Sequence, residues 1–489
     1  GGGSTSAALL ARALLWQGEA AQAEEALAAH PPPAGDPAQL LRWGSTRVAN
    51  FMFSAGDSTR ADAVLQSLRQ QITHPMLSLI VEGMASAVAA HENRLPDAVA
   101  AAERVFREPA AHPAAIEWAC FGGGRALSLM GRGDEVDALS ARMRSVADRL
   151  DGLLRYPAAL GEIHALTLTG DLDTARTRAQ RYFEFSSSGQ YVAWALANTL
   201  MGTADVAQGR FGDAVPRLEQ ALAALHAKAA ASWILPAEIL LVQTYAAIGR
   251  TGDAAAIYAD AQARMGRHVA IFEAQLGLAR AWLAAAEGTT SIAIESARST
   301  AESARSSGQH AIEAEALHAA VRFGDHDAAP RLAELAEFVH GRLVVMQARH
   351  ATALAAEDAA ALDASAAEFE SIGALLSAAD AAAQASNAHG AVQDRSAMLG
   401  TAATASRLAA RCGGAVTPAL QAAAHPLPLT VREREIANLV AAGLTNREVA
   451  ERLVVSVRTV EGHVYRMCTK LGVADRGQLA DLVRGGSRS

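Results

Sequence analysis

The sequence predicts an all-α protein in two parts, a long solenoid of helical hairpins followed by a small four-helix domain. The 489-residue chain is 51% hydrophobic but only 5% aromatic, and such a composition, rich in alanine and leucine, is typical of packed helices. Short turn sequences recur along most of the chain at a nearly constant spacing. Near the C-terminus this spacing ends, and consecutive helix caps predict four short helices instead.

Turn sequences mark the units of the predicted solenoid. They are centred on Gly18, Gly56, Asn93, Gly131, Gly170, Gly209, Gly249, Gly288, Gly324 and Glu357, which lie 33 to 40 residues apart. In segments such as AIGRTGDAAAIY, a Gly ends one helix and an Asp or Thr caps the next. Each unit is therefore predicted to be a helical hairpin. Tandem hairpins of this length resemble tetratricopeptide-like repeats, which stack into solenoids and use their concave side for function.

Large aromatic residues recur early in the first helix of several units. They are Trp43, Trp118, Tyr156, Trp194 and Trp233. These side chains either form a ligand-binding ladder or fill the space between neighbouring hairpins, and packing is the commoner use of such residues. The solenoid is expected to cover residues 1–410, with its least regular part between residues 351 and 388. Gly413, Gly414 and several prolines predict a linker over residues 411–426.

Helix caps define the C-terminal domain, predicted over residues 427–489. Thr430 with Glu433 and Thr445 with Glu448 each have the spacing of a capping box. The first pair predicts a helix from about residue 431 to 442, and Gly443 fits the left-handed position that ends it. The second pair starts another helix after a tight turn. This order is that of a helix-turn-helix.

A third helix is predicted to begin after a Ser456 cap and to have two different faces. Val460, Val464, Met467 and Leu471 recur at helical spacing and form an apolar seam. The opposite face carries polar residues and one glycine, Gly462. Recognition helices place such a face in the major groove. Because Gly costs roughly 1 kcal/mol inside a helix, Gly462 indicates either close approach of a partner or drift on a solvated face.

These residues resemble the LuxR-type helix-turn-helix. The resemblance extends without a gap over about twenty positions between Leu429 and Arg476. It implies a four-helix unit whose third helix enters the major groove and whose fourth, about residues 476 to 483, pairs two such units. The expected DNA-binding residues are Thr445, Asn446, Ser456, Arg458, Thr459, Glu461, Gly462, His463, Tyr465, Arg466, Lys470 and Arg476. Glu461 either accepts a hydrogen bond from cytosine or leans away from the DNA.

Charge divides the chain in the same way. Residues 425–489 contain 10 basic and 7 acidic side chains, a net charge of +3, whereas the rest of the chain carries −11. Because phosphate neutralisation dominates DNA binding, contacts with DNA are expected only from the C-terminal domain. A net charge of +3 is modest. One such domain is therefore expected to bind weakly without dimerisation or a partner.

The expected function is that of a bacterial transcription regulator, an activator, in the cytoplasm. Promoter DNA and RNA polymerase are its expected partners, it is expected to form a homo-oligomer on DNA, and the solenoid would receive a signal from a small molecule or a protein. The alternative is a scaffold whose repeats hold a partner protein while the C-terminal domain localises it to DNA. Three scattered cysteines fit a reducing compartment. The sequence has no apolar run of about 18 residues, so no membrane span is expected.

An enzyme is not expected. The sequence has no GxxxxGK[ST] phosphate loop, no GxSxG elbow, no HExxH and no paired CxxC. The two parts together resemble the C-terminal portion of the large ATP-binding LuxR regulators, in which a P-loop ATPase precedes the repeats. No cofactor is therefore expected in this chain. ATP would be involved only if an N-terminal ATPase domain had been removed, as the Gly-rich start suggests.

Overall fold

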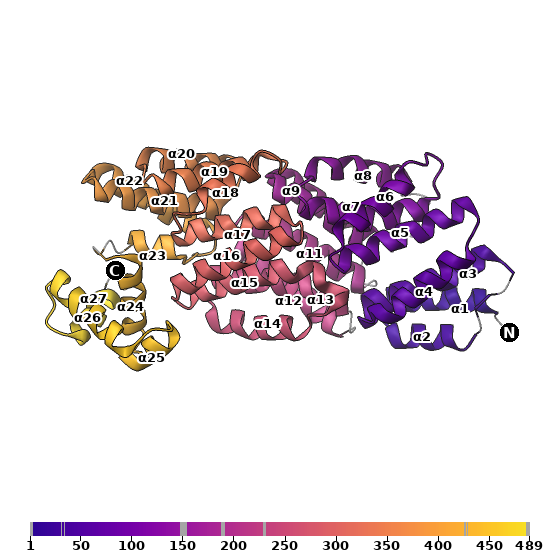
Figure 1. Ribbon diagram of the computed structural model, residues 1–489, viewed down its shortest axis with the longest axis horizontal. Coiled ribbons are helices and arrows are strands. Elements are labelled where there is room, and N and C mark those ends of the chain that lie inside the picture. The colour runs from indigo at the N-terminus through magenta and orange to yellow at the C-terminus, as the bar shows by residue number, and fades with distance from the viewer. Residues whose placement is uncertain are drawn as a thin grey trace.

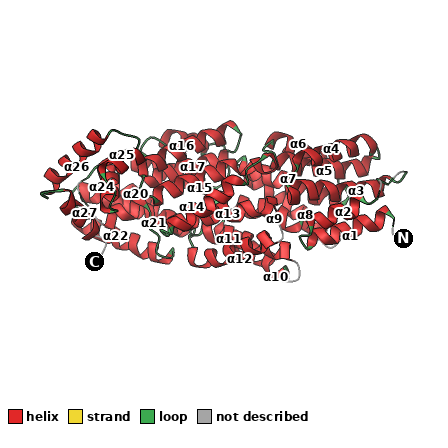
Figure 2. Ribbon diagram, turned by 90° about the horizontal axis from the view of Figure 1, so that it is seen from below, coloured by secondary structure: helices red, strands yellow, loops and turns green. Residues whose placement is uncertain are grey.

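The computed structural model describes residues 3–30, 32–33, 35–146, 154–186, 191–227, 231–424, 427 and 429–485. Within these ranges the protein consists of helices, turns and loops with no strand, as Figure 2 shows. The molecule is elongated, with the N-terminal hairpins at one end and the C-terminal domain at the other (Figure 1). The all-α prediction is confirmed.

Helices α1 to α22 pair into successive hairpins. Their bounds, with a π-helical turn η1 and a 3₁₀ segment η3, are α1 Ser4–Trp16, α2 Ala20–Ala28, α3 Pro37–Ala49, η1 Asn50–Ala55, α4 Ser58–Gln71, α5 Pro75–His91, α6 Leu95–Phe106, α7 Pro113–Leu129, α8 Gly133–Val146, α9 Arg155–Thr169, α10 Leu172–Phe185, α11 Tyr191–Ala207, α12 Phe211–Ala227, α13 Ala231–Ala247, α14 Thr251–Ala263, η3 Arg267–Phe272, α15 Glu273–Ala286, α16 Thr290–Ser306, α17 His310–Phe323, α18 Ala329–Leu335, α19 Arg342–Ala355, α20 Ala359–Ser371, α21 Leu375–Ala391 and α22 Arg395–Arg411.

Left-handed residues make the turns of these hairpins, as predicted. All ten predicted turn residues have a positive φ, between 52° and 103°. Asn93 and Glu357 adopt this conformation without being glycine, and Gln393, with a φ of 63°, does the same between α21 and α22. The sequence did not predict the Gln393 turn, because Gln has no preference for left-handed backbone. The solenoid therefore has one more hairpin than predicted.

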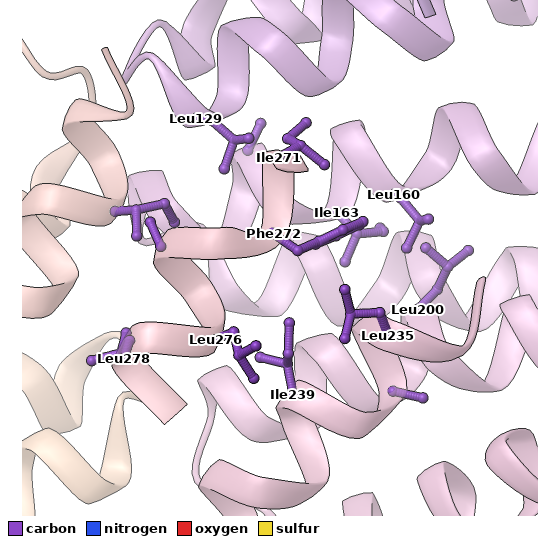
Figure 3. Close-up of a cluster of buried hydrophobic side chains, with 14 of the residues drawn as sticks. Leu129, Leu160, Ile163, Leu200, Leu235, Ile239, Ile271, Phe272, Leu276 and Leu278 are labelled. Atoms are coloured by element: carbon purple, nitrogen blue, oxygen red, sulfur yellow. The ribbon is translucent and has the colours of Figure 1, made fainter. Parts of the chain in front are cut away.

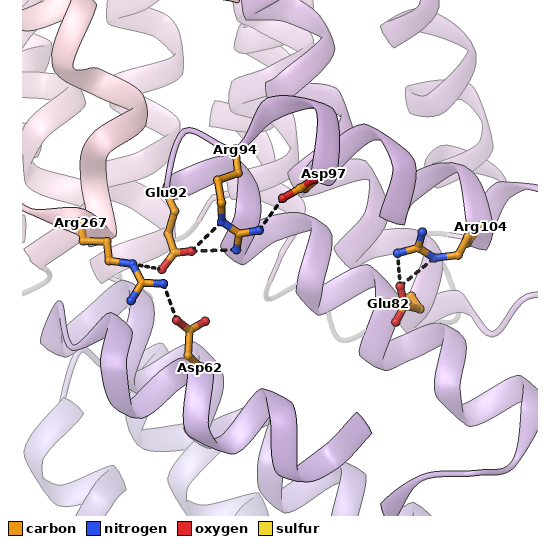
Figure 4. Close-up of polar contacts among 7 residues, drawn as sticks. All are labelled: Asp62, Glu82, Glu92, Arg94, Asp97, Arg104 and Arg267. Atoms are coloured by element: carbon orange, nitrogen blue, oxygen red, sulfur yellow. Dashed lines mark hydrogen bonds and ion pairs between the residues drawn. The ribbon is translucent and has the colours of Figure 1, made fainter. Parts of the chain in front are cut away.

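The solenoid coils back on itself, so that hairpins distant in sequence touch. Arg267 of η3 contacts the Asp62 carboxylate of α4 at 2.6 Å and the Glu92 carboxylate after α5 at 2.9 Å (Figure 4). Further along, the backbone N–H of His340 donates to the Gly131 carbonyl at 2.7 Å. These contacts bring the second half of the solenoid onto the turns of the first half. Much of the concave side is therefore filled by the protein itself.

Aromatic side chains take part in this closure. The Phe53 ring of η1 lies 5.2 Å from the Phe121 ring of α7 and 5.5 Å from the Trp233 ring of α13. Four of the five predicted aromatic positions are buried and Trp194 is half-buried, which favours the packing interpretation. The stretch Arg267–Ala286 is long and apolar enough to cross a membrane, but 67% of its most apolar window is buried in the solenoid as η3 and α15.

The segment after α22 is packed against the solenoid. Cys412 and Thr417 are buried, and the backbone N–H of Val416 donates to the Ala247 carbonyl at 2.8 Å. A short helix, α23 (Pro418–Ala424), follows. The Pro and Gly residues interrupt the helices here, as the sequence indicated, yet the segment is not a loose tether. Residues 425 and 426 of the predicted linker lie outside the described residues.

The C-terminal domain contains four helices with their own hydrophobic core. They are α24 Val431–Ala441, α25 Asn446–Arg452, α26 Val457–Leu471 and α27 Arg476–Gly485. Their buried apolar residues, among them Ile436, Val449, Val460 and Leu479, form a cluster separate from that of the solenoid. Residues 428 and 486–489 lie outside the described residues.

Candidate nucleic-acid interface

Side-chain caps fix where the helices of the C-terminal domain begin. The Thr430 and Glu433 side chains form a complete capping box at α24, and Thr445 and Glu448 form another at α25. The Ser456 side chain accepts the Thr459 backbone N–H and caps α26. These three starts are those predicted. They place α25 and α26 in the order of a helix-turn-helix.

The turn between α25 and α26 has an unusual residue. Val454 has a φ of +54° and is 86% exposed. A β-branched residue is disfavoured in left-handed backbone, and its large apolar side chain is left in solvent. The sequence predicted only that a new helix begins after Ser456. The strain and exposure at Val454 lie directly before the helix that is expected to read DNA.

Helix α26 has the two faces that its sequence predicted. Val460 and Met467 are fully buried and Val464 is 8% exposed, so the apolar seam faces the domain core. The opposite face is exposed, and Tyr465 on it is 74% exposed. A Cβ atom built on Gly462 would meet no atom within 4 Å. Packing within the chain therefore does not require a glycine at this position.

The predicted DNA-binding residues divide into two groups. One group lies exposed on α26 and consists of Arg458, Thr459, Glu461, Gly462, Tyr465, Arg466 and Lys470, with the half-buried His463 beside them. The other group lies at helix starts and consists of Thr445, Asn446, Ser456 and Arg476. The structure thus brings eight of the twelve residues together on one helix, and it shows intramolecular roles for several of the others.

Several of these side chains have partners within the domain. Lys470 Nζ lies 3.2 Å from a carboxylate oxygen of Glu433. Arg476 Nε donates to Asn446 Oδ1 at 3.2 Å, and its guanidinium also donates to the Leu444 carbonyl. Thr445 and Ser456 use their hydroxyl groups in caps. These residues therefore hold the helices of the domain together, whatever they contribute to DNA binding.

Two basic residues of α26 differ in whether their side chains have partners within the protein. Among the described residues, Arg458 has no hydrogen-bond or ion-pair partner for its side chain, whereas an Arg466 Nη atom lies 3.1 Å from His463 Nδ1. Partial burial and the Arg466 charge lower the pKa of His463. At neutral pH the His463 ring is therefore neutral and can accept the Arg466 hydrogen bond.

Sequence reasoning missed a contact between the domain and the solenoid. The Glu435 side chain of α24 is fully buried, and its Oε1 accepts the Ser291 backbone N–H and hydroxyl of α16, both at 3.0 Å. Arg432 donates to Glu435 at 2.6 Å, to the Ser291 hydroxyl at 2.8 Å and to the Leu453 carbonyl at 3.2 Å. No local pattern could have indicated this contact, because Ser291 and Glu435 are 144 residues apart.

This contact leaves the polar face of α26 open. It involves α24 and the end of α25, where an Arg452 nitrogen lies 3.7 Å from a Glu287 carboxylate oxygen. The polar face of α26 stays exposed. On α27, Leu482 is 40% exposed, so part of the face expected to pair two domains is accessible as well.

The domain has four helices, of which α25 and α26 are capped and joined by a tight turn, and α26 exposes a polar face. This arrangement defines a helix-turn-helix DNA-binding domain. Residues 427–483 match the family of bacterial regulatory proteins, luxR family. The HTH-type transcriptional regulator Mb0914c of Mycobacterium bovis is 48% identical over 62 residues, which are 12% of this chain and 7% of that protein. The tetrathionate response regulatory protein TtrR of Salmonella typhimurium is 50% identical over 56 residues, 12% of this chain and 26% of that protein. The C-terminal domain is a LuxR-family helix-turn-helix domain.

The solenoid has a structural likeness of its own. A Rap protein, solved in complex with competence and sporulation factor, superposes with a TM-score of 0.50 at 14% sequence identity. The superposition covers 72% of this chain and 98% of the Rap chain. At this identity the likeness shows the fold alone, a tetratricopeptide-like helical solenoid. The LuxR-family relatives match only the C-terminal domain, so they say nothing of the solenoid.

Proposed function

We propose that this chain is a DNA-binding transcription regulator that activates promoters, with α26 in the major groove and the solenoid, residues 1–410, as its sensor. The observation that carries the proposal is the exposed face of α26. It presents Arg458, Tyr465 and Arg466 around a glycine whose outer side is open. Such a face lets basic side chains reach phosphates while the helix backbone approaches the bases.

The solenoid is proposed to regulate by pairing two C-terminal domains. A net charge of +3 makes one domain a weak binder, and pairing turns the second contact into an intramolecular one, which raises avidity by roughly 10²-fold or more. Two observations support this mechanism: the Ser291 contact leaves α26 open, and Leu482 of α27 is accessible for pairing. RNA polymerase would then be recruited to the occupied promoter.

The test is a genome-wide map of the DNA that the full chain binds, followed by titration of the full chain on one recovered two-fold site. Binding should be specific for one DNA sequence. The logarithm of the association constant should fall steeply as the logarithm of the salt concentration rises. Chains without the C-terminal domain should recover no DNA. If the full chain shows no preference for any sequence over random DNA, the proposal is wrong. Recovery of one dominant protein with no DNA preference would instead support the scaffold alternative.

A further inference from the structure

A cleft of about 200 Å³ lies inside the solenoid. Its walls come from the first helices of several hairpins, chiefly α9, α11, α13, α15 and α17, and α7 contributes Arg125. Leu160, Ile239 and Leu278 make much of the wall apolar, and Figure 3 shows them gathered around Phe272. The cleft is what remains of the concave side after the solenoid has coiled back on itself. Its volume has room for on the order of ten water molecules.

One cation in this wall has no countercharge. Arg125 of α7 is 6% exposed and lines the cleft. Among the described residues, no carboxylate lies within ion-pair distance of its guanidinium, which stacks over the Phe272 ring at 5.0 Å. Burial lowers the pKa of Arg125 to about 10, so the group is still charged at neutral pH. Burying a charge without a partner is costly, and proteins normally avoid it.

Several other buried charges of the solenoid are paired. Asp205 is fully buried and lies 3.0 Å from Arg176, and the fully buried Asp380 lies 2.7 Å from Arg322. Arg125 differs from these two carboxylates, because it has no charged partner in the part of the chain that the structure describes and lies where the chain opens into a cleft. This difference indicates that the compensating charge comes from outside the chain.

Arg125 and its polar neighbours have more hydrogen-bond donors than acceptors. One Nη atom lies 3.0 Å from His164 Nδ1 and the other donates to Gln275 Oε1 at 3.3 Å. The Gln275 amide nitrogen lies 3.3 Å from His164 Nε2. A neutral imidazole has one donor and one acceptor nitrogen. Every combination of His164 tautomer and Gln275 amide orientation therefore leaves at least one donor facing another donor.

An anion would resolve both deficits. Arginine has five N–H donors in a planar fork, and two of them make the contacts just described. The remaining donors are available to the two oxygens of a carboxylate or of a phosphate group, which are the groups that a guanidinium binds in bidentate fashion. The same oxygens could accept the surplus donor of His164 or Gln275.

We propose that the cleft binds a small organic anion, whose acidic group is held by Arg125 and whose apolar body lies against Leu160, Ile239 and Leu278. The inference deepens the proposed function, because it rests on the solenoid being the sensor and gives the chemical class of the signal. The cleft has room for a ligand of on the order of ten non-hydrogen atoms. A folded partner or a long peptide is too large for it.

The experiment measures ligand binding by the full chain without DNA. The probes are hexanoate, its uncharged counterpart hexanamide, hexyl phosphate and inorganic phosphate, each followed by melting temperature and by calorimetric titration. Hexanoate or hexyl phosphate should raise the melting temperature in proportion to the logarithm of concentration above its dissociation constant. Hexanamide should not. The comparison of the two acids shows whether the acidic group is a carboxylate or a phosphate, and binding of inorganic phosphate as tight as that of hexyl phosphate would contradict the apolar part of the site.

Two variants of Arg125 and one control sharpen the test. Arg125→Gln should weaken binding of the organic anion by about tenfold or more, because a charge-assisted bidentate contact is lost. Arg125→Lys keeps the charge and should keep the preference for acid over amide, with intermediate affinity. Arg349→Gln removes the same charge from an exposed ion pair with Glu368, outside the cleft, and should bind like the wild type.

Three results would overturn the inference. They are binding of hexanamide as tight as that of hexanoate, unchanged affinity in both Arg125 variants, and no shift with any of the anions. Binding of operator DNA by the same protein is measured separately, without probes. Loss of DNA specificity with intact anion binding would refute the proposed function and leave the cleft standing, whereas specific DNA binding without any anion effect would refute the cleft alone.

Discussion

Replacing Ser291 by alanine should loosen the contact between the solenoid and the DNA-binding domain. The substitution lies in α16, outside the domain, so no DNA-contacting group changes. It removes the hydroxyl group that donates to Glu435 at 3.0 Å and accepts from Arg432 at 2.8 Å. A hydrogen bond to a charged group contributes about 1.5–3 kcal/mol. The population of the undocked state should therefore rise by roughly 10- to 150-fold.

Hydrogen exchange of one backbone amide reports this equilibrium. Residue 291 is the second residue of α16, after the Thr289 N-cap and Thr290. Amides of the first helical turn have no acceptor within the helix, so the protection of this amide depends on its 3.0 Å bond to Glu435. In Ser291→Ala, hydrogen exchange at the residue 291 amide should become faster by roughly 10- to 150-fold. Amides in the middle of α16 should not change.

The matched control is Ser306→Ala on the same helix. The Ser306 hydroxyl is exposed and, among the described residues, bonds only the Ser303 carbonyl of its own helix. Glu435→Ala is the stronger variant, because it removes both carboxylate oxygens that accept from Ser291. If exchange at residue 291 is the same in wild type, Ser291→Ala and Glu435→Ala, the two parts do not dock through Ser291, and the reasoning fails.

Three further predictions concern α26 and the buried His350. Arg458→Ala and Arg466→Ala should each reduce the slope of log affinity against log salt by about 0.9, because each removes one phosphate contact; equal slopes in wild type and both variants would reject this docking of α26. Gly462→Leu should abolish specific DNA binding while circular dichroism shows unchanged or higher helicity, since the Cβ position is open and Leu is the better helix former; full affinity would place Gly462 away from the DNA. Burial lowers the pKa of His350 from 6.5 to about 4, so below pH 6.5 the unfolded chain binds a proton that the folded chain does not, and urea midpoints should fall as the pH falls from 6.5 to 4; His350→Gln should reduce this dependence, and an unaltered pH profile would contradict it.

Turns and caps could be predicted from the sequence because their causes are local. A left-handed turn residue needs only its own backbone preference, and all ten predicted positions have a positive φ. The capping boxes at Thr430 and Thr445 likewise depend on two side chains three residues apart. The Gln393 turn was missed because glutamine has no preference of its own for left-handed backbone.

Contacts between distant segments could not be predicted. The Ser291–Glu435 contact joins two helices whose local patterns are complete without it. The segment after α22 shows the same limit: Pro and Gly tell where helices end, but they do not tell whether the chain between helices is loose. Cys412 and Thr417 are buried there because surfaces of the solenoid far away in sequence meet them.

The hairpin of α15 and α16 belongs both to the cleft and to the docking contact. Gln275, Leu278 and Trp282 of α15 line the cleft, and Ser291, which contacts Glu435, lies in the first turn of α16. Between them, the Glu287 carboxylate before the turn faces Arg452 of α25. A ligand that shifted α15 would therefore act on a helical hairpin whose other end contacts the DNA-binding domain. Such coupling must be reciprocal: if the anion raises affinity for DNA by some factor, DNA raises affinity for the anion by the same factor.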